Sequence, residues 1–175
     1  MPDLNTAGSV PLREPAETVD FRPPTLEDGG AMWRMAEQSR ALDLNTSYAY
    51  LLWARDFAAT SVVATVDGVH AGFVSGYRRP DEPATLMVWQ VATNEEFRGR
   101  GIARRMLDAL VDRHDGALSH LETTITEDNA ASIALFTAFA KGRGAEVERT
   151  PLFTTPLFPD GHDTELLFRI GPLNA

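Results

Sequence analysis

A short segment of glycines and arginines is the strongest candidate for chemistry in this sequence. It reads Arg98-Gly99-Arg100-Gly101-Ile102-Ala103 and leads into a stretch whose apolar residues recur at helical spacing. The first amides of a helix have no partner within the helix, and the helix dipole places positive charge at the same end. Glycine lets the backbone come close to a ligand. The segment therefore predicts a cradle for an anion such as a pyrophosphate.

The charges of the chain support an anionic ligand at this segment. The 175 residues include 16 Lys and Arg against 25 Asp and Glu, which gives a net charge of −9. Repulsion at that charge disfavours binding to nucleic acid or to an anionic membrane surface. Four arginines nevertheless gather at this one place: Arg98, Arg100, Arg104 and Arg105. This local reversal of sign favours a small polyanionic ligand.

Two other phosphate-binding loops fit the segment less well. A Walker loop requires Lys followed by Ser or Thr after its glycines, and that pair is absent. A dinucleotide fingerprint, G-x-G-x-x-G/A, is met by Gly99 and Gly101, and Glu122 stands about where the ribose-binding acid belongs. Its third small position is Arg104, however, and residues 94–97 separate the loop from the preceding strand. An ordinary turn with a helix cap is the remaining structural alternative.

Apolar periodicity and turn residues indicate the elements that must position this segment. We expect helices around 31–36, 48–57, 102–111 and 133–139, and strands at 61–66, 71–77, 86–93, 121–126 and 166–170. Asp67-Gly68 is a hairpin turn signal, Asp128 or Asn129 can cap the last helix, and Gly142 and Gly144 can end it. The order of these elements predicts an α/β (α+β) fold with a mixed sheet flanked by helices.

Composition bounds the organisation of the chain. Residues 1–20 contain scattered prolines and acids without apolar periodicity, so we expect a flexible N-terminal tail followed by a single domain over 21–175. We see neither a secretory leader nor an apolar run of bilayer length, and we expect a cytoplasmic protein. The sequence has no cysteine, which excludes disulfides, zinc–thiolate sites and a thiol nucleophile. No metal is expected.

The glycine-and-arginine segment resembles the coenzyme A loop of the GNAT acetyltransferase superfamily, whose pattern is R/Q-x-x-G-x-G/A. Arg98, Gly101 and Ala103 match this pattern, and Asn129 opens a helix that continues through Ser132, Leu135 and Phe136, as in the family. The resemblance runs from about residue 21 to the C-terminus. It implies a GNAT-like single domain with a mixed, mostly antiparallel, twisted sheet, and acetyl-CoA as cosubstrate. It also implies a set of cofactor-binding residues: Val91, Arg98, Gly99, Arg100, Gly101, Ile102, Ala103, Arg104, Asn129 and Phe136.

Longer strings resemble one branch of that superfamily, the diaminobutyrate acetyltransferases of ectoine synthesis. They are Leu-Asp-Leu-Asn-Thr-Ser-Tyr-Ala-Tyr at 42–50, Val-Trp-Gln-Val at 88–91, Leu-Glu-Thr-Thr at 121–124 and Leu-Phe-Pro-Asp-Gly-His at 157–162. This resemblance implies transfer of the acetyl group of acetyl-CoA to the γ-amine of L-2,4-diaminobutyrate. It also suggests a homodimer, while the acidic charge of the chain argues against nucleic acid and membranes as partners.

A diamino acid carries two ammonium groups and one carboxylate, so its site needs acids, hydrogen-bond acceptors and a donor. The candidate substrate residues are Asp43, Asn45, Ser47, Tyr48, Trp89 and Glu165, with His162 able to bind a polar end. Each has a structural alternative. Asp43 and Asn45 can cap the following helix, Trp89 can be core, and His162 can be an exposed turn residue.

Glu122 is the candidate for proton transfer. Strand alternation places it on one face with His120 and Thr124, and an acid inside a central strand needs a partner, for which a substrate ammonium is a candidate. Without cysteine, the amine would attack the thioester directly in a ternary complex. Glu122 is then the first choice as general base and His162 the second.

The reaction also requires stabilisation of the thioester oxygen and departure of the coenzyme A thiolate. A backbone amide near Val91 would polarise the thioester oxygen. Many GNAT relatives carry a tyrosine as the acid for the departing thiolate where this chain has Phe136. That departure leaves two alternatives: a GNAT enzyme for another small amine, or a coenzyme A-binding regulatory module without turnover.

Overall fold

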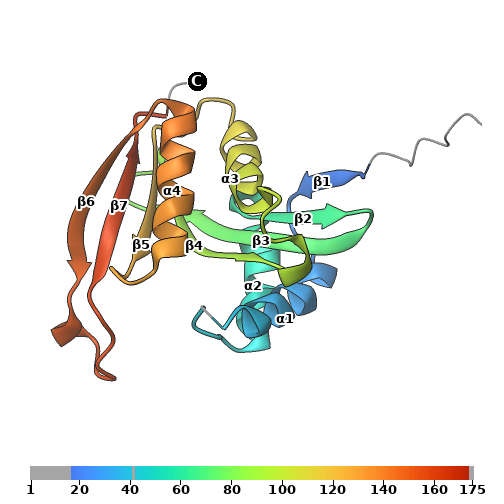
Figure 1. Ribbon diagram of the computed structural model, residues 1–175, viewed down its shortest axis with the longest axis horizontal. Coiled ribbons are helices and arrows are strands. Elements are labelled where there is room, and N and C mark those ends of the chain that lie inside the picture. Colours follow the sequence, from blue (N-terminus) through green and yellow to red (C-terminus); the bar gives the residue numbers. More distant parts are fainter. Residues whose placement is uncertain (1–16, 41, 174–175) are drawn as a thin grey trace, which may run out of the picture.

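A seven-stranded sheet runs through the molecule (Figure 1). The computed structural model describes residues 17–40 and 42–173. The strands are β1 Val19–Arg22, β2 Val62–Val66, β3 Val69–Arg78, β4 Thr85–Thr93, β5 His120–Ile125, β6 Glu146–Phe153 and β7 Glu165–Gly171. Their order across the sheet is β1-β2-β3-β4-β5-β7-β6.

Only the central pair, β4 and β5, is parallel among these strands, and its pairing is short. Thr85, Leu86 and Met87 pair with His120, Leu121 and Glu122, and there the ladder stops. Both strands continue beyond that point, β4 to Thr93 and β5 to Ile125. The sheet therefore opens along its middle, toward the carboxyl ends of the parallel strands.

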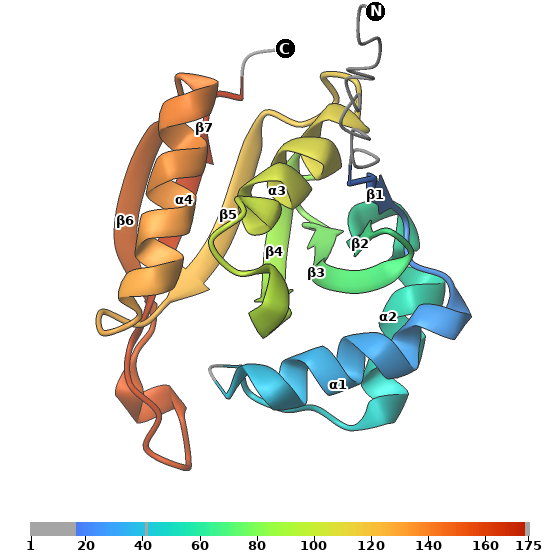
Figure 2. The same cartoon turned by 45° about the vertical axis from the view of Figure 1, so that its right-hand side comes forward.

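Two helix pairs cover opposite faces of the sheet (Figure 2). Helices α1 (Gly29–Ser39) and α2 (Ser47–Asp56) pack with Val63, Phe73 and Ala92. Helices α3 (Ile102–Asp112) and α4 (Ala130–Arg143) pack on the larger core, which takes alternate residues such as Val62 and Val74 from the same strands. Period-two alternation thus feeds both faces of the sheet, as expected for strands buried on both sides.

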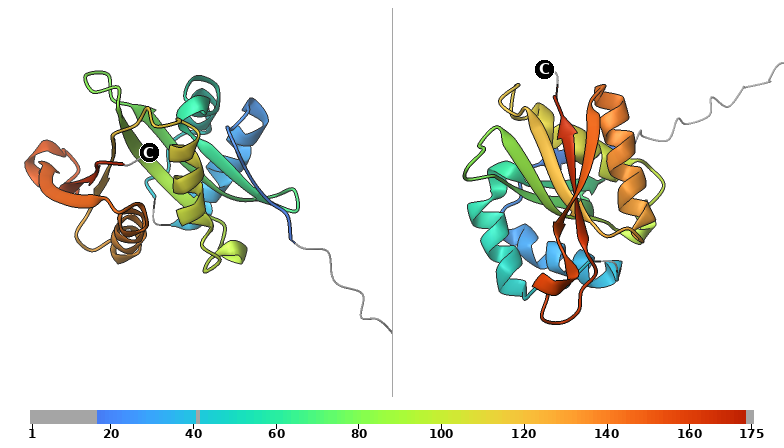
Figure 3. Two further views of the ribbon diagram at one scale, coloured as in Figure 1. Left: turned by 90° about the horizontal axis from the view of Figure 1, so that it is seen from above. Right: turned by 90° about the vertical axis from the view of Figure 1, so that its left-hand side faces the viewer.

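The β6–β7 hairpin extends past the helices, at the far end of the sheet from β1 (Figures 1 and 3). Its connection, between Phe153 and Glu165, includes one 3-10 turn at Thr155–Leu157. This connection carries His162 toward the open edge of β4 and β5, and the segment between α1 and α2 approaches the same edge from the other side.

The expected fold class is confirmed: a single α/β domain with a mixed, mostly antiparallel sheet between helices. The Asp67-Gly68 turn joins β2 to β3, with both residues at positive φ, and Asn129 rather than Asp128 caps α4. Two boundaries differ. Strand β1 begins at Val19, inside the expected tail, because it pairs with β2; the part of the tail at 1–16 lies outside the described residues. Gly142 lies within α4, and Gly144 alone ends it, at φ +64°.

None of the described helices is long and apolar enough to cross a bilayer. In the same part of the chain, no group of three or more His, Asp and Glu residues is placed to hold a metal ion.

Candidate functional site

A pocket of about 360 Å³ lies where β4 and β5 separate. The open edges of both strands line it, and α4, the α1–α2 segment and the β6–β7 connection close its sides. The lining residues are Leu42, Asp43, Asn45, Val88, Trp89, Gln90, Val91, Thr123, Thr124, Ile125, Thr126, Asn129, Ser132, Phe136, His162 and Glu165. Because β5 leaves β4 after Met87, backbone groups of 88–93 on that edge have no strand partner there. They are available to a ligand that lies along the strand.

A β-bulge shapes the wall of the pocket in β4. Ser75 pairs with Gln90, whereas the next residue of β3, Gly76, pairs with Val88, so Trp89 is the extra residue. Val88 and Val91 pack with the α3–α4 core, while Trp89 stacks on Trp53 of α2 with ring centroids 4.3 Å apart. The bulge thus turns two consecutive side chains, Trp89 and Gln90, to the α2 side. Trp89 is 39% exposed and is not a core residue.

The glycine-and-arginine segment forms a loop between β4 and the start of α3. Gly99 and Gly101 have φ of +77° and +70°, which is the left-handed region, and apart from the adjoining residues no atom of the described chain lies within 4 Å of the place of a Cβ at either. Gly101 is the N-cap of α3, and no side chain caps that end. Buried Phe97 and Ile102 anchor the loop on either side. The first amides of α3 are therefore open to an anion.

The four arginines near the loop do not act together. Arg98 lies at the loop, where its Nε donates to the carbonyl of Thr93 at 3.4 Å. Arg100 pairs with Glu17 at 2.6 Å, and Arg105 lies over the ring of Phe21.

Arg104 turns away from the loop and joins α3 to α4. It pairs with Asp108 at 2.9 Å and donates to the carbonyl of Ala138 at 2.8 Å. A Cβ at Gly142 would overlap its guanidinium. Arg143 completes the bridge through Asp108 and Asp112, at 2.8 and 2.7 Å. The expectation that Arg104 contacts the ligand at the loop therefore does not fit its geometry, since its donors bond Asp108 within α3 and Ala138 of α4.

Helix α4 supplies two expected residues to the pocket. Asn129 Oδ1 accepts the amide of Ser132 at 3.0 Å, which caps the helix and orients the Asn129 amide group at the pocket wall. Phe136 is buried and presents only its ring. The position therefore provides an apolar wall and no proton donor.

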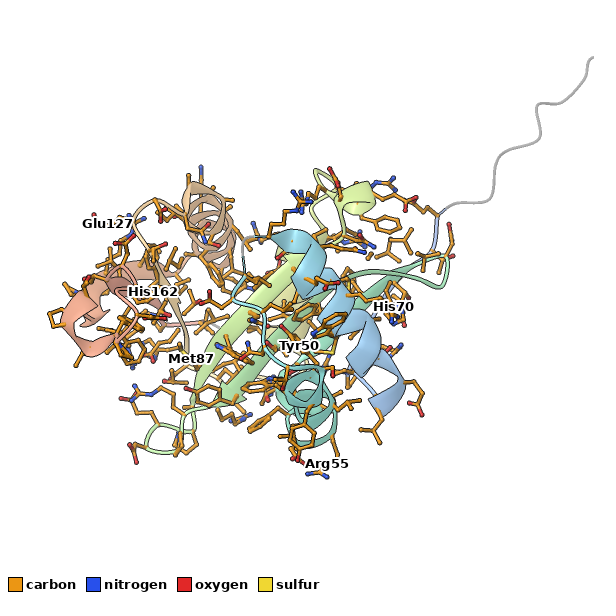
Figure 4. All side chains as sticks on the ribbon, turned by 90° about the horizontal axis from the view of Figure 1, so that it is seen from below. Tyr50, Arg55, His70, Met87, Glu127 and His162 are labelled. Atoms are coloured by element: carbon orange, nitrogen blue, oxygen red, sulfur yellow. The ribbon has the colours of Figure 1, made fainter. Side chains whose placement is uncertain are left out.

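Asp43, His162 and Glu165 form a charged cluster at the pocket mouth. His162 Nε2 lies 3.9 Å from Asp43 Oδ2 and 3.7 Å from Glu165 Oε1. Figure 4 shows His162 on the β6–β7 connection. Asp43 has 92% of its side chain exposed, whereas Glu165 Oε2 is buried without a hydrogen-bond partner. A buried carboxylate oxygen in that state is costly unless a cation reaches it.

The pKa of His162 lies above the ordinary histidine value. Its Nδ1 bonds the carbonyl of Asp163 at 2.7 Å, which favours the protonated ring, and the negative charges of Glu165, Asp43 and Asp160 add to this. His162 also stacks on Phe158, with centroids 4.6 Å apart. The ring is thus held in place at the mouth, in surroundings that favour its protonated form.

The remaining expected substrate residues divide between the pocket and the surface. Asn45 lines the pocket and donates to the carbonyl of Asp43 at 3.2 Å. Ser47 begins α2, and Tyr48 on the same helix is 66% exposed; neither side chain lines the pocket.

Glu122 has its partners within the chain, so the interpretation that a substrate ammonium balances its charge is wrong. Its carboxylate is 2% exposed and pairs with Arg169 through Oε1 and with Arg79 through Oε2, the latter at 3.3 Å. The residue does not line the pocket. Because guanidinium groups hold both oxygens, the geometry gives Glu122 a structural role, joining β5 to β7 and to the residue that follows β3.

Residues 28–140 match the Acetyltransferase (GNAT) family. The chain belongs to the GNAT acetyltransferase family. Enzymes of this family use acetyl-CoA. In this GNAT acetyltransferase the open edge of β4 and the capped start of α4 line one pocket, and the loop at 98–103 follows β4 in the chain and leads into α3.

More specific relatives lie within this GNAT family. The chain is 56% identical to the L-2,4-diaminobutyric acid acetyltransferase of Streptomyces coelicolor over 156 residues, 87% of this chain and 92% of that protein. It is 46% identical to the Nocardia farcinica protein of the same name, over 97% and 95% of the two chains. A solved structure, diaminobutyrate acetyltransferase EctA from Paenibacillus lautus with L-2,4-diaminobutyric acid and coenzyme A, matches with a TM-score of 0.85 at 36% identity, over 91% and 98%.

The sequence interpretation of this GNAT chain missed two parts of the pocket. Thr123 and Thr124 of β5 and Thr126 just after it bring hydroxyl groups, and Gln90 brings an amide from β4. Thr123 and Thr124 belong to the Leu-Glu-Thr-Thr string at 121–124, but their position at the opening depends on where the pairing of β4 with β5 ends.

Replacing Gly101 by Val should weaken coenzyme A binding of the GNAT enzyme at least about tenfold, or 1.4 kcal/mol, because a side chain would enter the cradle. The left-handed backbone alone costs about 1–2 kcal/mol of stability. Gly144→Val is the matched control, since Gly144 is also at positive φ with open space around it but ends α4. Calorimetric titration with coenzyme A should show the loss for Gly101→Val only; equal affinities for both variants would contradict the loop assignment.

Replacing Glu122 by Gln should destabilise the protein rather than disable the reaction. We expect the free energy of unfolding to fall by about 1–3 kcal/mol, because two partly exposed guanidinium groups lose a buried partner. Urea denaturation measures this change, and kcat at a temperature where both proteins are folded should stay within about threefold of the wild type. A loss of kcat by orders of magnitude in a stable, folded variant would restore Glu122 as a catalytic residue.

Proposed function

We propose that this protein transfers the acetyl group of acetyl-CoA to the γ-amine of L-2,4-diaminobutyrate, giving the Nγ-acetyl product. The observation that carries the proposal is the buried, unpartnered Oε2 of Glu165, beside Asp43 and His162, in a pocket that also reaches the capped start of α4. The relatives add the chemical identity of the amine, since they are named for diaminobutyric acid at 36–56% identity.

Acetyl-CoA would occupy the loop at 98–103 and the open edge of β4. Its diphosphate would take the first amides of α3 at Gly99–Ala103, with Arg98 beside it. The pantetheine arm would run along the open edge of Val88–Val91, where backbone groups face away from β3, and Phe136 would form its apolar wall. The thioester would then lie near Val91, whose amide we propose as the oxyanion donor.

The acceptor fits the charged end. Glu165 and Asp43 offer negative charge to an ammonium group, and the face of Trp89 at the same mouth can attract a cation. None of the described residues lining the pocket is Lys or Arg. The substrate carboxylate must therefore be bound by uncharged hydrogen-bond donors. Threonine hydroxyls at 123, 124 and 126 and the Asn129 amide are the donors present.

The reaction proceeds by direct attack, since the chain has no cysteine to carry an acetyl group. The amine is a nucleophile only when neutral, and an alkylamine near pKa 10 is protonated at neutral pH. We propose His162 as the group that takes its proton, with Asp43 and Glu165 stabilising the resulting imidazolium. Phe136 cannot donate to the leaving sulfur, so the thiolate leaves unprotonated from this position.

The biological setting rests on the relatives alone. We propose that the product serves ectoine synthesis, because the solved relative is EctA. Cytoplasmic location and a homodimer stay predictions from the sequence.

The direct test follows thiol release from acetyl-CoA with diaminobutyrate, ornithine and lysine as acceptors. We expect diaminobutyrate to have the highest kcat/KM, at least about tenfold above ornithine, because one methylene in a shaped slot changes binding by about 1–3 kcal/mol. Mass spectrometry should place the acetyl group on the γ-nitrogen. Release with none of these amines would sink the proposal, and equal rates with all three would leave only a general amine acetyltransferase.

The pH dependence tests the role of His162. Activity should fall as the pH drops through the pKa of His162, and this acidic limb of kcat/KM should lie above the ordinary histidine value because the hydrogen bond to the Asp163 carbonyl and the neighbouring carboxylates raise that pKa. Asp160→Asn removes one of those charges outside the pocket and should move the limb to lower pH without loss of maximal rate. His162→Ala should remove the limb; an unchanged profile in both variants would exclude His162 as the proton acceptor.

A further inference from the structure

We propose that Gln90 is a positioning residue that sets the length of diamine the site accepts. It would act by tying the α1–α2 segment, and with it Asp43, to the central strand. This inference rests on the proposed function, because it concerns the acceptor end of the same pocket.

Gln90 lies in the middle of the sheet but points into the site. It is 4% exposed, it follows the bulge residue Trp89 in β4, and it lines the pocket. Its Nε2 donates to the carbonyl of Asp43 at 2.9 Å. Among the described residues, this is the one hydrogen bond that joins 42–46 to the sheet, and those residues form neither helix nor strand.

This bond fixes one wall of the acceptor slot relative to the other. Asp43 stands on the α1–α2 segment, whereas Glu165 begins β7, and His162 lies between them at 3.9 and 3.7 Å. These separations are too long for hydrogen bonds and are weak constraints between side chains. Gln90 therefore provides the stronger tie, and it acts on the backbone of Asp43 rather than on its exposed carboxylate.

The chemistry of the position argues against a role in folding alone. Burying an amide is costly unless all its atoms are satisfied, yet Gln90 Oε1 is buried without a partner. An apolar side chain of the same length would pack with less loss. The hydrogen bond from Gln90 Nε2 to the carbonyl of Asp43 accounts for a glutamine at this position.

The test uses Gln90→Met, which keeps the length of the side chain and removes the donor. We expect KM for diaminobutyrate to rise about tenfold, the preference for diaminobutyrate over ornithine to fall by about the same factor, and KM for acetyl-CoA to stay unchanged. Hydrogen exchange of 42–46 should become faster in the free enzyme. Ser75→Ala is the matched control: Ser75 is the cross-strand neighbour of Gln90, its hydroxyl is also buried and unpartnered, and it does not line the pocket.

A purely structural role would give a different result. Lower stability would reduce the active fraction, and therefore kcat, equally for both diamines, while KM and the ratio would stay as in the wild type. If Gln90→Met does not fold, Gln90→Glu has the same shape and cannot donate to the carbonyl when ionised, so the same ratio is measured on it. An unchanged ratio together with unchanged exchange in the folded variant overturns the role of Gln90.

Assays of the wild-type enzyme distinguish a failure of the Gln90 role from a failure of the proposed function. A wild-type enzyme that does not acetylate diaminobutyrate contradicts the proposed function. If it prefers another diamine, the ratio for that diamine and its homologue one methylene longer decides the role of Gln90. If it acetylates no amine, both proposals are overturned.

Discussion

The site depends on one constraint: two parallel strands that begin as neighbours and then separate. Parallel pairing of β4 and β5 covers three residues of each strand, after which both continue without each other. An open strand edge normally invites another strand or must be covered. Here it faces a pocket, so its unpaired backbone groups can serve a ligand. The bulge at Trp89 and the helix start at Asn129 bring further polar groups to that opening.

Patterns that arise within a few residues were predictable from the sequence. The Asp67-Gly68 turn, the alternation around Glu122, the Asn129 cap and the open loop at 98–103 each depend on local backbone preference and were predicted at the right residues. The order of helices and strands followed from the same patterns. Resemblance to the GNAT family then supplied what local patterns cannot, namely which cosubstrate the enzyme uses.

Pairings between distant residues could not be predicted in this way. Glu122 meets Arg79 and Arg169, which lie more than forty positions away on either side, so its need for a partner was clear but the identity of that partner was not. The arginine cluster looked uniform in sequence, yet Arg104 points to α4 because Gly142 leaves room for it. Glu122 and Glu165 differ in their partners and in their position. Both are acids in neighbouring strands, and only the one with an unpartnered oxygen lines the pocket.

Polar contacts of Arg104 and Arg143 form a bridge between α3 and α4. Arg104 and Arg143 join the two helices through four hydrogen bonds, one from Arg104 to the carbonyl of Ala138 and three from Arg143 to Asp108 and Asp112, and Arg104 fits closely against Gly142. Asn129 at the start of α4 lines the pocket, so this bridge braces one of its walls. The opposite rim consists of the β6–β7 connection that bears His162 and of residues 42–46, which among the described residues Gln90 alone ties to the sheet by a hydrogen bond. Substitutions on that rim should therefore reshape the end of the pocket at His162 and leave the α3–α4 frame in place.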